Sequence, residues 1–187
     1  ATPPPRAALL PHIWLSDEES RQGQRLLEQL PDKAGTPPIA LHPYATHPDK
    51  AWKEAYWRQL VELFESRGIP WIVIGRGSGM EGIPASRNFT NRTSLRETCA
   101  LLKSSSLLIT GDSGPMHLAG AVGTPVLALF GPTTEEWGFF PAGPKDRVLE
   151  SQLDCRPCTL HGKKHCDRNH ACMQSITPEQ VMRALDE

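Results

Sequence analysis

The 187-residue sequence lacks the long apolar runs and the charge excess that mark membrane-spanning and nucleic-acid-binding chains. No hydrophobic stretch approaches the roughly 20 residues of a transmembrane helix, and no signal-peptide pattern opens the sequence. Its formal net charge of -1 argues against a dedicated nucleic-acid binder. With 39% hydrophobic and 22% charged residues, the chain should form one good-sized globular domain, and we expect it in the cytoplasm.

An initiator methionine is also missing, because the sequence begins with Ala-Thr-Pro-Pro-Pro. We therefore expect a fragment or a processed product. Residues 1–14 are predicted to be a linker, since they are rich in proline and show no hydrophobic periodicity. Residues 15–187 are predicted to form the folded domain.

The stretch that organises this domain is residues 107–133, LLITGDSGPMHLAGAVGTPVLALFGPT. An apolar run predicts a buried strand at 107–109, a polar turn follows at 111–114, and a second apolar run predicts a strand at 126–130. Between them Pro115 suits the first turn of a short helix, and Gly123 suits the position after its end. Such a strand–helix–strand unit forms a parallel sheet, whose ligand site lies beyond the carboxyl end of the first strand.

The turn and helix start in this unit have the chemistry of an anion site. The N–H groups of a helix start attract phosphate, and glycine lets a ligand approach the backbone. Asp112 or Ser113 can cap the helix, and His117 would project from its first turn as a donor. The alternative is an ordinary turn with a cap and a structural histidine.

Other segments predict the rest of an α/β domain. Ser16 with Glu19, and Ser94 with Glu97, form capping-box patterns. The predicted strands are residues 39–42, 71–75, 88–91 and 147–149. The predicted helices are residues 16–30, 52–67, 94–103 and 177–185, the second with an apolar face of Trp52, Tyr56, Leu60 and Phe64 and the third with Leu95, Cys99 and Leu102 facing inward.

Residues 111–133 resemble the signature of glycosyltransferase family 9, the ADP-heptose:lipopolysaccharide heptosyltransferases, and the similarity extends over the chain from about residue 15. The resemblance implies a GT-B enzyme with two Rossmann-like domains, of which this chain would be the C-terminal, donor-binding one. We thus expect a three-layer α/β fold with a mostly parallel sheet. The implied partners are ADP-L-glycero-D-manno-heptose, a lipopolysaccharide inner-core acceptor, the missing N-terminal domain and, peripherally, the cytoplasmic face of the inner membrane.

A second corner follows the strand predicted at 39–42. Its loop carries Thr46 and Lys50, a hydroxyl and an ammonium suited to a diphosphate. An exposed lysine with no ligand is the alternative. The family's loop ends in Asp-Lys-x-Trp, which matches residues 49–52, although Lys53 stands where the family often has proline. The resemblance implies that Lys50 stabilises the leaving phosphate.

The resemblance also implies further donor contacts. The glycine-rich turn at 75–82 would approach the nucleoside. Glu81 would accept hydrogen bonds from the ribose hydroxyls, and the alternative is a solvated carboxylate in a loop. The full set expected to bind the donor is Thr46, Lys50, Glu81, Thr93, Ser94, Asp112, Ser113, Gly114, Pro115, Met116 and His117.

The implied reaction is displacement at the anomeric carbon with inversion, and the carboxylate base would lie in the N-terminal domain. No cofactor is expected for catalysis, since the sequence has no DxD-type metal motif. Two other functions stay open. One is a GT-B enzyme acting on a UDP-sugar, such as an epimerase, and the other is a metal-stabilised, non-catalytic interaction module.

The segment 151–173 carries Cys155, Cys158, Cys166 and Cys172 with the spacing C-x2-C-x7-C-x5-C. These residues could bind a structural zinc ion, for which C-x2-C is the usual half-site. Two disulfides would also cross-link the segment, although the cytosol disfavours them. Four reduced thiols in a packed loop are the third alternative. A similar Cys-x-Pro-Cys occurs in the heptosyltransferase-II-like branch of the family.

Overall fold

The computed structural model describes residues 10–31, 36–78, 80–161 and 165–186. Residues 1–9 of the predicted linker and Gly79 of the predicted glycine-rich turn lie outside this part. No helix in the described ranges is both long and apolar enough to cross a membrane.

A five-stranded, all-parallel sheet forms the centre of the molecule, in the order β2-β1-β3-β4-β5. The strands are β1 (Ile39–His42), β2 (Trp71–Val73), β3 (Leu107–Gly111), β4 (Val126–Phe130) and β5 (Arg147–Glu150). Leu41, Ile109 and Leu127 stand level across the three central strands. The expected α/β fold with a parallel sheet is confirmed. The strand predicted at 88–91 is wrong, because in the described chain this segment makes only an isolated bridge from Asn88 to Val73.

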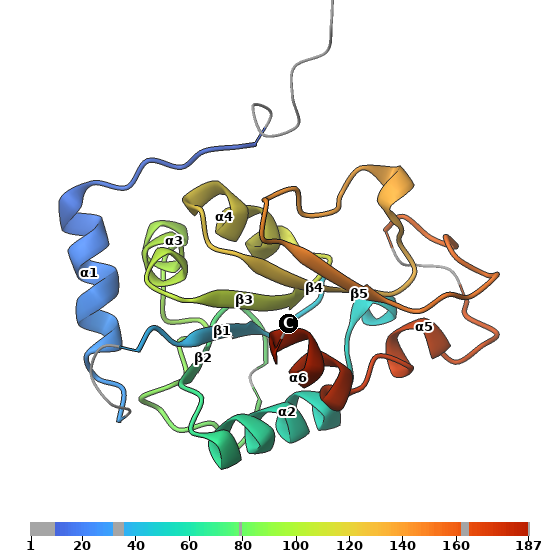
Figure 1. Cartoon of the computed structure of the whole chain (residues 1–187), viewed down its shortest axis with the longest axis horizontal. Helices are drawn as coiled ribbons and strands as arrows, with labels where there is room; N and C mark the ends of the chain where they lie inside the picture. The colour runs from blue at the N-terminus through green and yellow to red at the C-terminus, as the bar shows by residue number, and fades with distance from the viewer. Residues whose placement is uncertain (1–9, 32–35, 79, 162–164, 187) are drawn as a thin grey trace, which may run out of the picture.

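Helices cover both faces of the sheet, which gives three layers (Figure 1). One face carries α2 (Glu54–Arg67) and α6 (Pro178–Asp186), and the other carries α3 (Leu95–Lys103) and α4 (Gly114–Val122). The helix α1 (Asp17–Leu27) lies outside the sheet and packs on α3. The shorter elements are η2 (Pro48–Lys50), η3 (Glu135–Trp137) and α5 (Ala171–Gln174).

The core is divided between these two faces by the alternation of side chains along the strands. Leu41 and Ile109 point to the α2–α6 side, where Trp57 and Phe64 are fully buried. Leu108 points to the α3–α4 side. Burial of each such large side chain contributes about 1.5–3 kcal/mol, so the strand ends are held firmly enough to position a site.

The predicted helix signals are largely confirmed. Both capping boxes form, Ser16 with Glu19 and Ser94 with Glu97. Gly68 and Gly123 end their helices in the left-handed conformation, with φ of 64° and 83°.

Two predictions about helix residues are wrong. The helix α2 begins at Glu54 and not at Trp52, because residues 48–50 form the separate 3-10 turn η2. Trp52 is nevertheless buried ahead of the helix. Leu95 was expected to face inward but is 69% exposed, since it is the first residue of α3 and lies over the edge of a pocket.

Candidate functional site

The strand order locates the site. After β1 the chain crosses to one side for β2 and then to the other side for β3, so the order reverses between β1 and β3. In open parallel sheets ligands bind in the crevice outside the carboxyl ends of the strands at such a switch point. The site is therefore expected above His42 and Gly111, the last residues of the two strands.

A pocket of about 430 Å³ lies at this point, within the ~300–1,000 Å³ typical of small-molecule sites. It is lined from four segments: the loop after β1, the turn after β2, the start of α3 and the start of α4. The lining residues are His42, Tyr44, Ala45, Thr46, Gly75, Arg76, Thr93, Leu95, Thr98, Ser113, Gly114, Pro115 and Leu118.

The start of α4 forms one wall of the pocket. Ser113 occupies the N-cap position, but in the described chain its side chain makes no cap hydrogen bond to the helix. Its hydroxyl instead lies 2.9 Å from Thr110 Oγ1 and 3.3 Å from His42 Nδ1. The prediction that Asp112 or Ser113 caps this helix with its side chain is thus wrong. The uncapped first turn keeps the partial positive charge that attracts an anion.

His42 forms the floor beneath Ser113. Its side chain is buried, and its Nδ1 also lies 3.1 Å from Thr110 Oγ1. Burial lowers the pKa of His42 to about 4, so the imidazole is neutral at pH 7. Both hydroxyls lie within hydrogen-bond distance of the same neutral ring nitrogen, which helps to orient them without adding charge to the pocket.

Lys50 and Asp112 form an ion pair beside the pocket. Lys50 Nζ lies 2.5 Å from Asp112 Oδ2, with the two side chains only 14% and 11% exposed. Thr133 Oγ1 donates to the same carboxylate oxygen at 3.1 Å. Asp112 lies one residue before the N-cap Ser113, and its Oδ2 accepts both donors from outside α4. The ion pair also joins the loop after β1 to the turn after β3.

The turn after β2 passes close to the β1 loop. Gly75 has a φ of 122°, and a Cβ added there would stand 2.5 Å from His42 Cδ2 and 2.7 Å from Tyr44 Cδ2. Tyr44 Oη lies 2.7 Å from Thr90 Oγ1, and burial raises the pKa of this phenol. The next residue, Arg76, is exposed and lines the pocket. Only glycine at position 75 allows this close approach.

Comparison with known proteins identifies the family. The sequence profile of Glycosyltransferase family 9 (heptosyltransferase) matches residues 10–167. The chain belongs to glycosyltransferase family 9. Lipopolysaccharide heptosyltransferase 1 of Pseudomonas aeruginosa is 35% identical over 153 residues, which are 74% of this chain and 40% of that protein. Lipooligosaccharide heptosyltransferase 2 of Campylobacter jejuni is 26% identical over 171 residues, which are 82% of this chain and 52% of that protein.

Solved structures agree with this fold. The Escherichia coli ADP-heptose lipopolysaccharide heptosyltransferase II superposes with a TM-score of 0.74 at 23% identity, over 99% of this chain and 54% of the other. The glycosyltransferase family 9 protein of Veillonella parvula superposes with a TM-score of 0.70 at 22% identity, over 94% of this chain and 52% of the other. The chain thus spans about half the length of these relatives.

Within this family-9 domain, the structure brings part of the predicted donor set together. Thr46, Thr93, Ser113, Gly114 and Pro115 line the pocket. Lys50 and Asp112 stand beside it as the ion pair.

Four other predicted contacts lie elsewhere among the described residues. Glu81 and His117 are exposed and outside the pocket lining, and the backbone oxygen of Glu81 accepts from Arg58 at 2.9 Å. The hydroxyl of Ser94 is used in the cap of α3. Met116 is 1% exposed in the core, so a ligand could reach only its backbone. Their roles in binding stay predictions.

Sequence reasoning did not find His42, Tyr44 and Arg76 as site residues. His42 ends β1 and Arg76 follows shortly after β2, so both lie at the carboxyl ends of parallel strands. The switch-point rule selects these positions once the strand order is known. The order itself depends on pairing between distant segments, and no local motif reports it.

The cysteine segment forms a second pocket, of about 230 Å³, lined by Cys155, Cys158, Cys166 and Cys172. None of the five cysteines, all of which are described, takes part in a disulfide. In the described ranges no three Cys, His, Asp or Glu side chains are already placed to hold a metal ion. Zinc binding by these cysteines stays a prediction.

Proposed function

We propose that this chain is the nucleotide-sugar donor-binding domain of an inverting heptosyltransferase. The donor would be ADP-heptose and the acceptor the lipopolysaccharide inner core, reached by peripheral contact at the cytoplasmic face of the inner membrane. The observation that carries the proposal is the pocket at the β1–β3 switch point, which is lined by the uncapped start of α4. The Lys50–Asp112 pair adjoins it, because Asp112 directly precedes the lining residue Ser113.

The charges around this cavity suit a diphosphate. The first turn of α4 offers a positive helix end at Ser113 and Gly114. Arg76 lines the same pocket, and its planar guanidinium can bind phosphate oxygens in pairs. Lys50 is neutralised by Asp112 in the structure. A phosphate that arrives between the two corners can take over part of the interaction of Lys50, which makes this lysine the most direct partner of the leaving group.

The apolar side of the pocket suits a nucleoside. Leu95 and Leu118 line it from α3 and α4, and Leu95 is 69% exposed. Thr46 and Thr93 also line it and could bind ribose or sugar hydroxyls, although the Thr93 hydroxyl lies 2.9 Å from Thr98 Oγ1. A base could rest on Leu95, which explains why this leucine faces away from the core.

In the proposed reaction the anomeric carbon loses ADP while an acceptor hydroxyl attacks from the opposite face. This domain would lower the barrier by stabilising the negative charge that develops on the leaving diphosphate. Lys50, Arg76 and the start of α4 supply that stabilisation. The carboxylate base that deprotonates the acceptor would come from the acceptor-binding domain, outside these 187 residues.

Calorimetric titration of the chain with ADP, UDP and GDP tests the proposal. We expect selective ADP binding that Lys50→Ala weakens about tenfold or more, since a hydrogen bond to a charged group contributes about 1.5–3 kcal/mol. Lys53→Ala is the matched control, because Lys53 is exposed and bonded to Gln174. A preference for UDP would overturn the assignment of the base. Equal effects of the two alanine substitutions would overturn the phosphate role of Lys50.

A further inference from the structure

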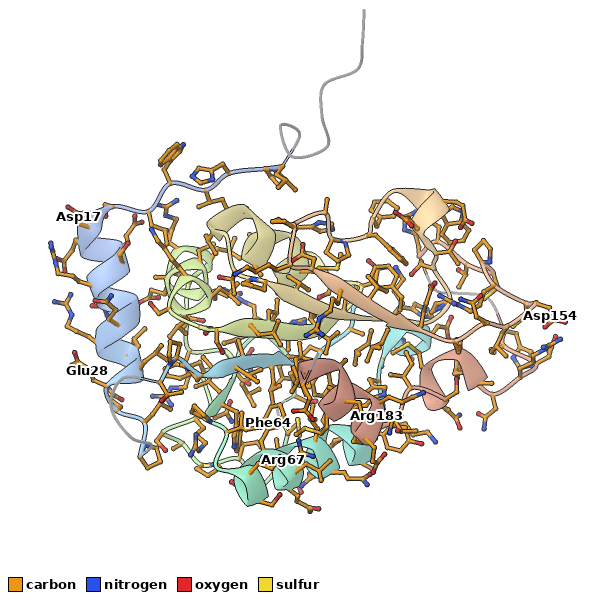
Figure 2. All side chains as sticks on the ribbon, in the orientation of Figure 1. Asp17, Glu28, Phe64, Arg67, Asp154 and Arg183 are labelled. Carbon is orange, nitrogen blue, oxygen red and sulfur yellow. The ribbon has the colours of Figure 1, made fainter. Side chains whose placement is uncertain are left out.

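Four cysteines from two separate stretches meet in one small pocket beside the donor site. Cys155 and Cys158 line it from one stretch, and Cys166 and Cys172 line it from the other. In Figure 2 Asp154, the residue before Cys155, lies at the end of the molecule opposite α1, whose first residue is Asp17. Four thiols that line a cavity of about 230 Å³ leave room for an ion among them.

Both stretches are anchored to the body of the domain. The backbone N–H of Cys158 donates to the Pro132 carbonyl at 3.1 Å. The Arg156 guanidinium, with a side chain only 4% exposed, donates to Thr133 O at 2.9 Å and to Glu150 Oε2 at 2.6 Å. In the second stretch, His170 Nε2 lies 2.8 Å from Asp49 Oδ1, and the Cys172 carbonyl accepts from Ser151 Oγ at 3.1 Å. These contacts hold the backbone around the pocket in place.

We propose that this pocket binds one thiolate-preferring transition-metal ion, for which Zn²⁺ is the first candidate, through Cys155, Cys158, Cys166 and Cys172. Four sulfur ligands around one centre are the set that zinc prefers in structural sites. In the described chain no three potential ligands yet converge on one point, so the thiols turn inward as the ion enters. Each thiol that becomes a ligand releases its proton to solvent.

The segment needs such a link for a physical reason. Apart from the single turn of α5, the described residues between β5 and α6 form no regular secondary structure, and Cys172 and Met173 are the only buried side chains before Ser175. A stretch of this length with so few apolar contacts gains little from burial. A metal ion bound by four residues would supply the missing cross-link.

The proposed metal site bears on the donor site through two contacts. His170 Nε2 lies 2.8 Å from Asp49 Oδ1, next in sequence to Lys50. Arg156 binds the carbonyl of Thr133, whose hydroxyl donates to Asp112. An ordered cysteine segment therefore supports both partners of the Lys50–Asp112 pair. This coupling rests on the proposed function, whereas metal binding itself does not.

Metal analysis of the purified chain tests the proposal directly. We expect about one tightly bound ion per chain by inductively coupled plasma mass spectrometry. Cys158→Ser and Cys166→Ser should each lose most of it, while Cys99→Ser retains it, because Cys99 is buried in α3 away from the pocket. A strong chelator should lower the Tm of the wild-type chain and leave the Tm of Cys158→Ser unchanged.

A second measurement does not depend on the folding of any variant. The metal-stripped wild-type chain, titrated with Co²⁺, should develop the intense sulfur-to-metal absorption of tetrahedral thiolate ligation and lose it on addition of Zn²⁺. A chain that stays metal-free and gains neither absorption nor Tm from added ions would overturn the proposal. So would an intact mass short of two hydrogens per bridge, since disulfides would then occupy the thiols. Nucleotide binding by the same preparation is read separately, so failure of the metal site and failure of the donor site are distinguishable.

Discussion

Lys50 Nζ lies 2.5 Å from Asp112 Oδ2, across 62 residues of sequence, and this pair connects the two corners of the candidate donor site. Both side chains are mostly buried, so the ammonium and the carboxylate are shielded from solvent by the loops that carry them. In the pair the two charges neutralise each other. Under the proposed function a bound phosphate would share Lys50 with Asp112, and Thr133 would still donate to the carboxylate.

The energetic coupling of this pair is the first prediction. Because both partners are shielded, we expect a double-mutant cycle of Lys50→Met and Asp112→Asn to give a coupling of about 1–3 kcal/mol in urea unfolding. The control is the Glu54–Arg58 pair on α2, whose side chains are 57% and 43% exposed. Its coupling should stay below about 0.5 kcal/mol. Equal couplings for the two pairs would show that burial does not strengthen the Lys50–Asp112 contact.

Gly75→Ala should destabilise the fold and damage the pocket together. The φ of 122° is strained for alanine, and the new Cβ would collide with the His42 and Tyr44 rings. We expect a loss of about 2 kcal/mol or more in the free energy of unfolding, and weaker nucleotide binding. Gly120→Ala in α4 is the control, because no described heavy atom lies within 4 Å of its added Cβ. That substitution should be neutral or stabilise by about 0.5–1 kcal/mol. A Gly75→Ala variant as stable as Gly120→Ala would contradict this account.

The elements that sequence predicted well are those decided by local chemistry. The central strand–helix–strand unit, the two capping boxes and the glycine C-caps all depend on residues within a few positions of one another. Periodicity and cap chemistry report such contacts directly. The helix start beside Asp112 is the informative exception. Its local pattern predicts a side-chain cap, but the hydroxyl of the N-cap residue Ser113 lies against Thr110 and against His42, 71 residues away.

What sequence could not supply is the set of contacts between segments. The strand order and therefore the switch point come from pairing across the sheet. His42 belongs to the site because it is buried and its Nδ1 lies 3.3 Å from the Ser113 hydroxyl, a contact that spans 71 residues of sequence. Leu95 was expected in the core because it follows a helical spacing, yet its position at the very start of α3 turns it toward the pocket. Hydrophobic periodicity shows which residues share one face of a helix. It does not show which other segment packs against that face.

Arg156→Met should be among the most destabilising substitutions of a charged residue in this chain. The nearly buried guanidinium donates to the carbonyls of Gly131, Ser151 and Thr133 and to the Glu150 carboxylate. Methionine would leave these acceptors unpaired, and we expect a loss of about 3 kcal/mol or more by urea unfolding.

The control for that substitution is Arg168→Met. Arg168 also pairs with a carboxylate, Asp154, but its side chain is 51% exposed and that of Asp154 is 78% exposed. Its replacement should change stability by less than about 1 kcal/mol. If the two variants unfold at the same urea concentration, the prediction is wrong. Water molecules would then replace the hydrogen bonds that Arg156 donates to the buried acceptors.

The pH dependence of stability should reveal the neutral state of His42. Burial lowers its pKa from 6.5 to about 4, so between these values the unfolded chain binds a proton that the folded chain does not. Stability should therefore fall as pH drops from 6.5 to 4, by about 3 kcal/mol in total from this group, and show no His42 contribution above that window. His42→Gln removes the titrating ring, so the difference in unfolding free energy between wild type and variant should shrink steadily with acidification. The Arg96 guanidinium lowers the pKa of Glu19 to about 2, so Glu19 changes the stability only below about pH 4.5. Both proteins contain Glu19, so its contribution cancels in the difference. If the unfolding free energies of wild type and His42→Gln change in parallel between pH 7 and 4.5, the pKa of His42 is not lowered. The imidazole would then be accessible to water in the folded state.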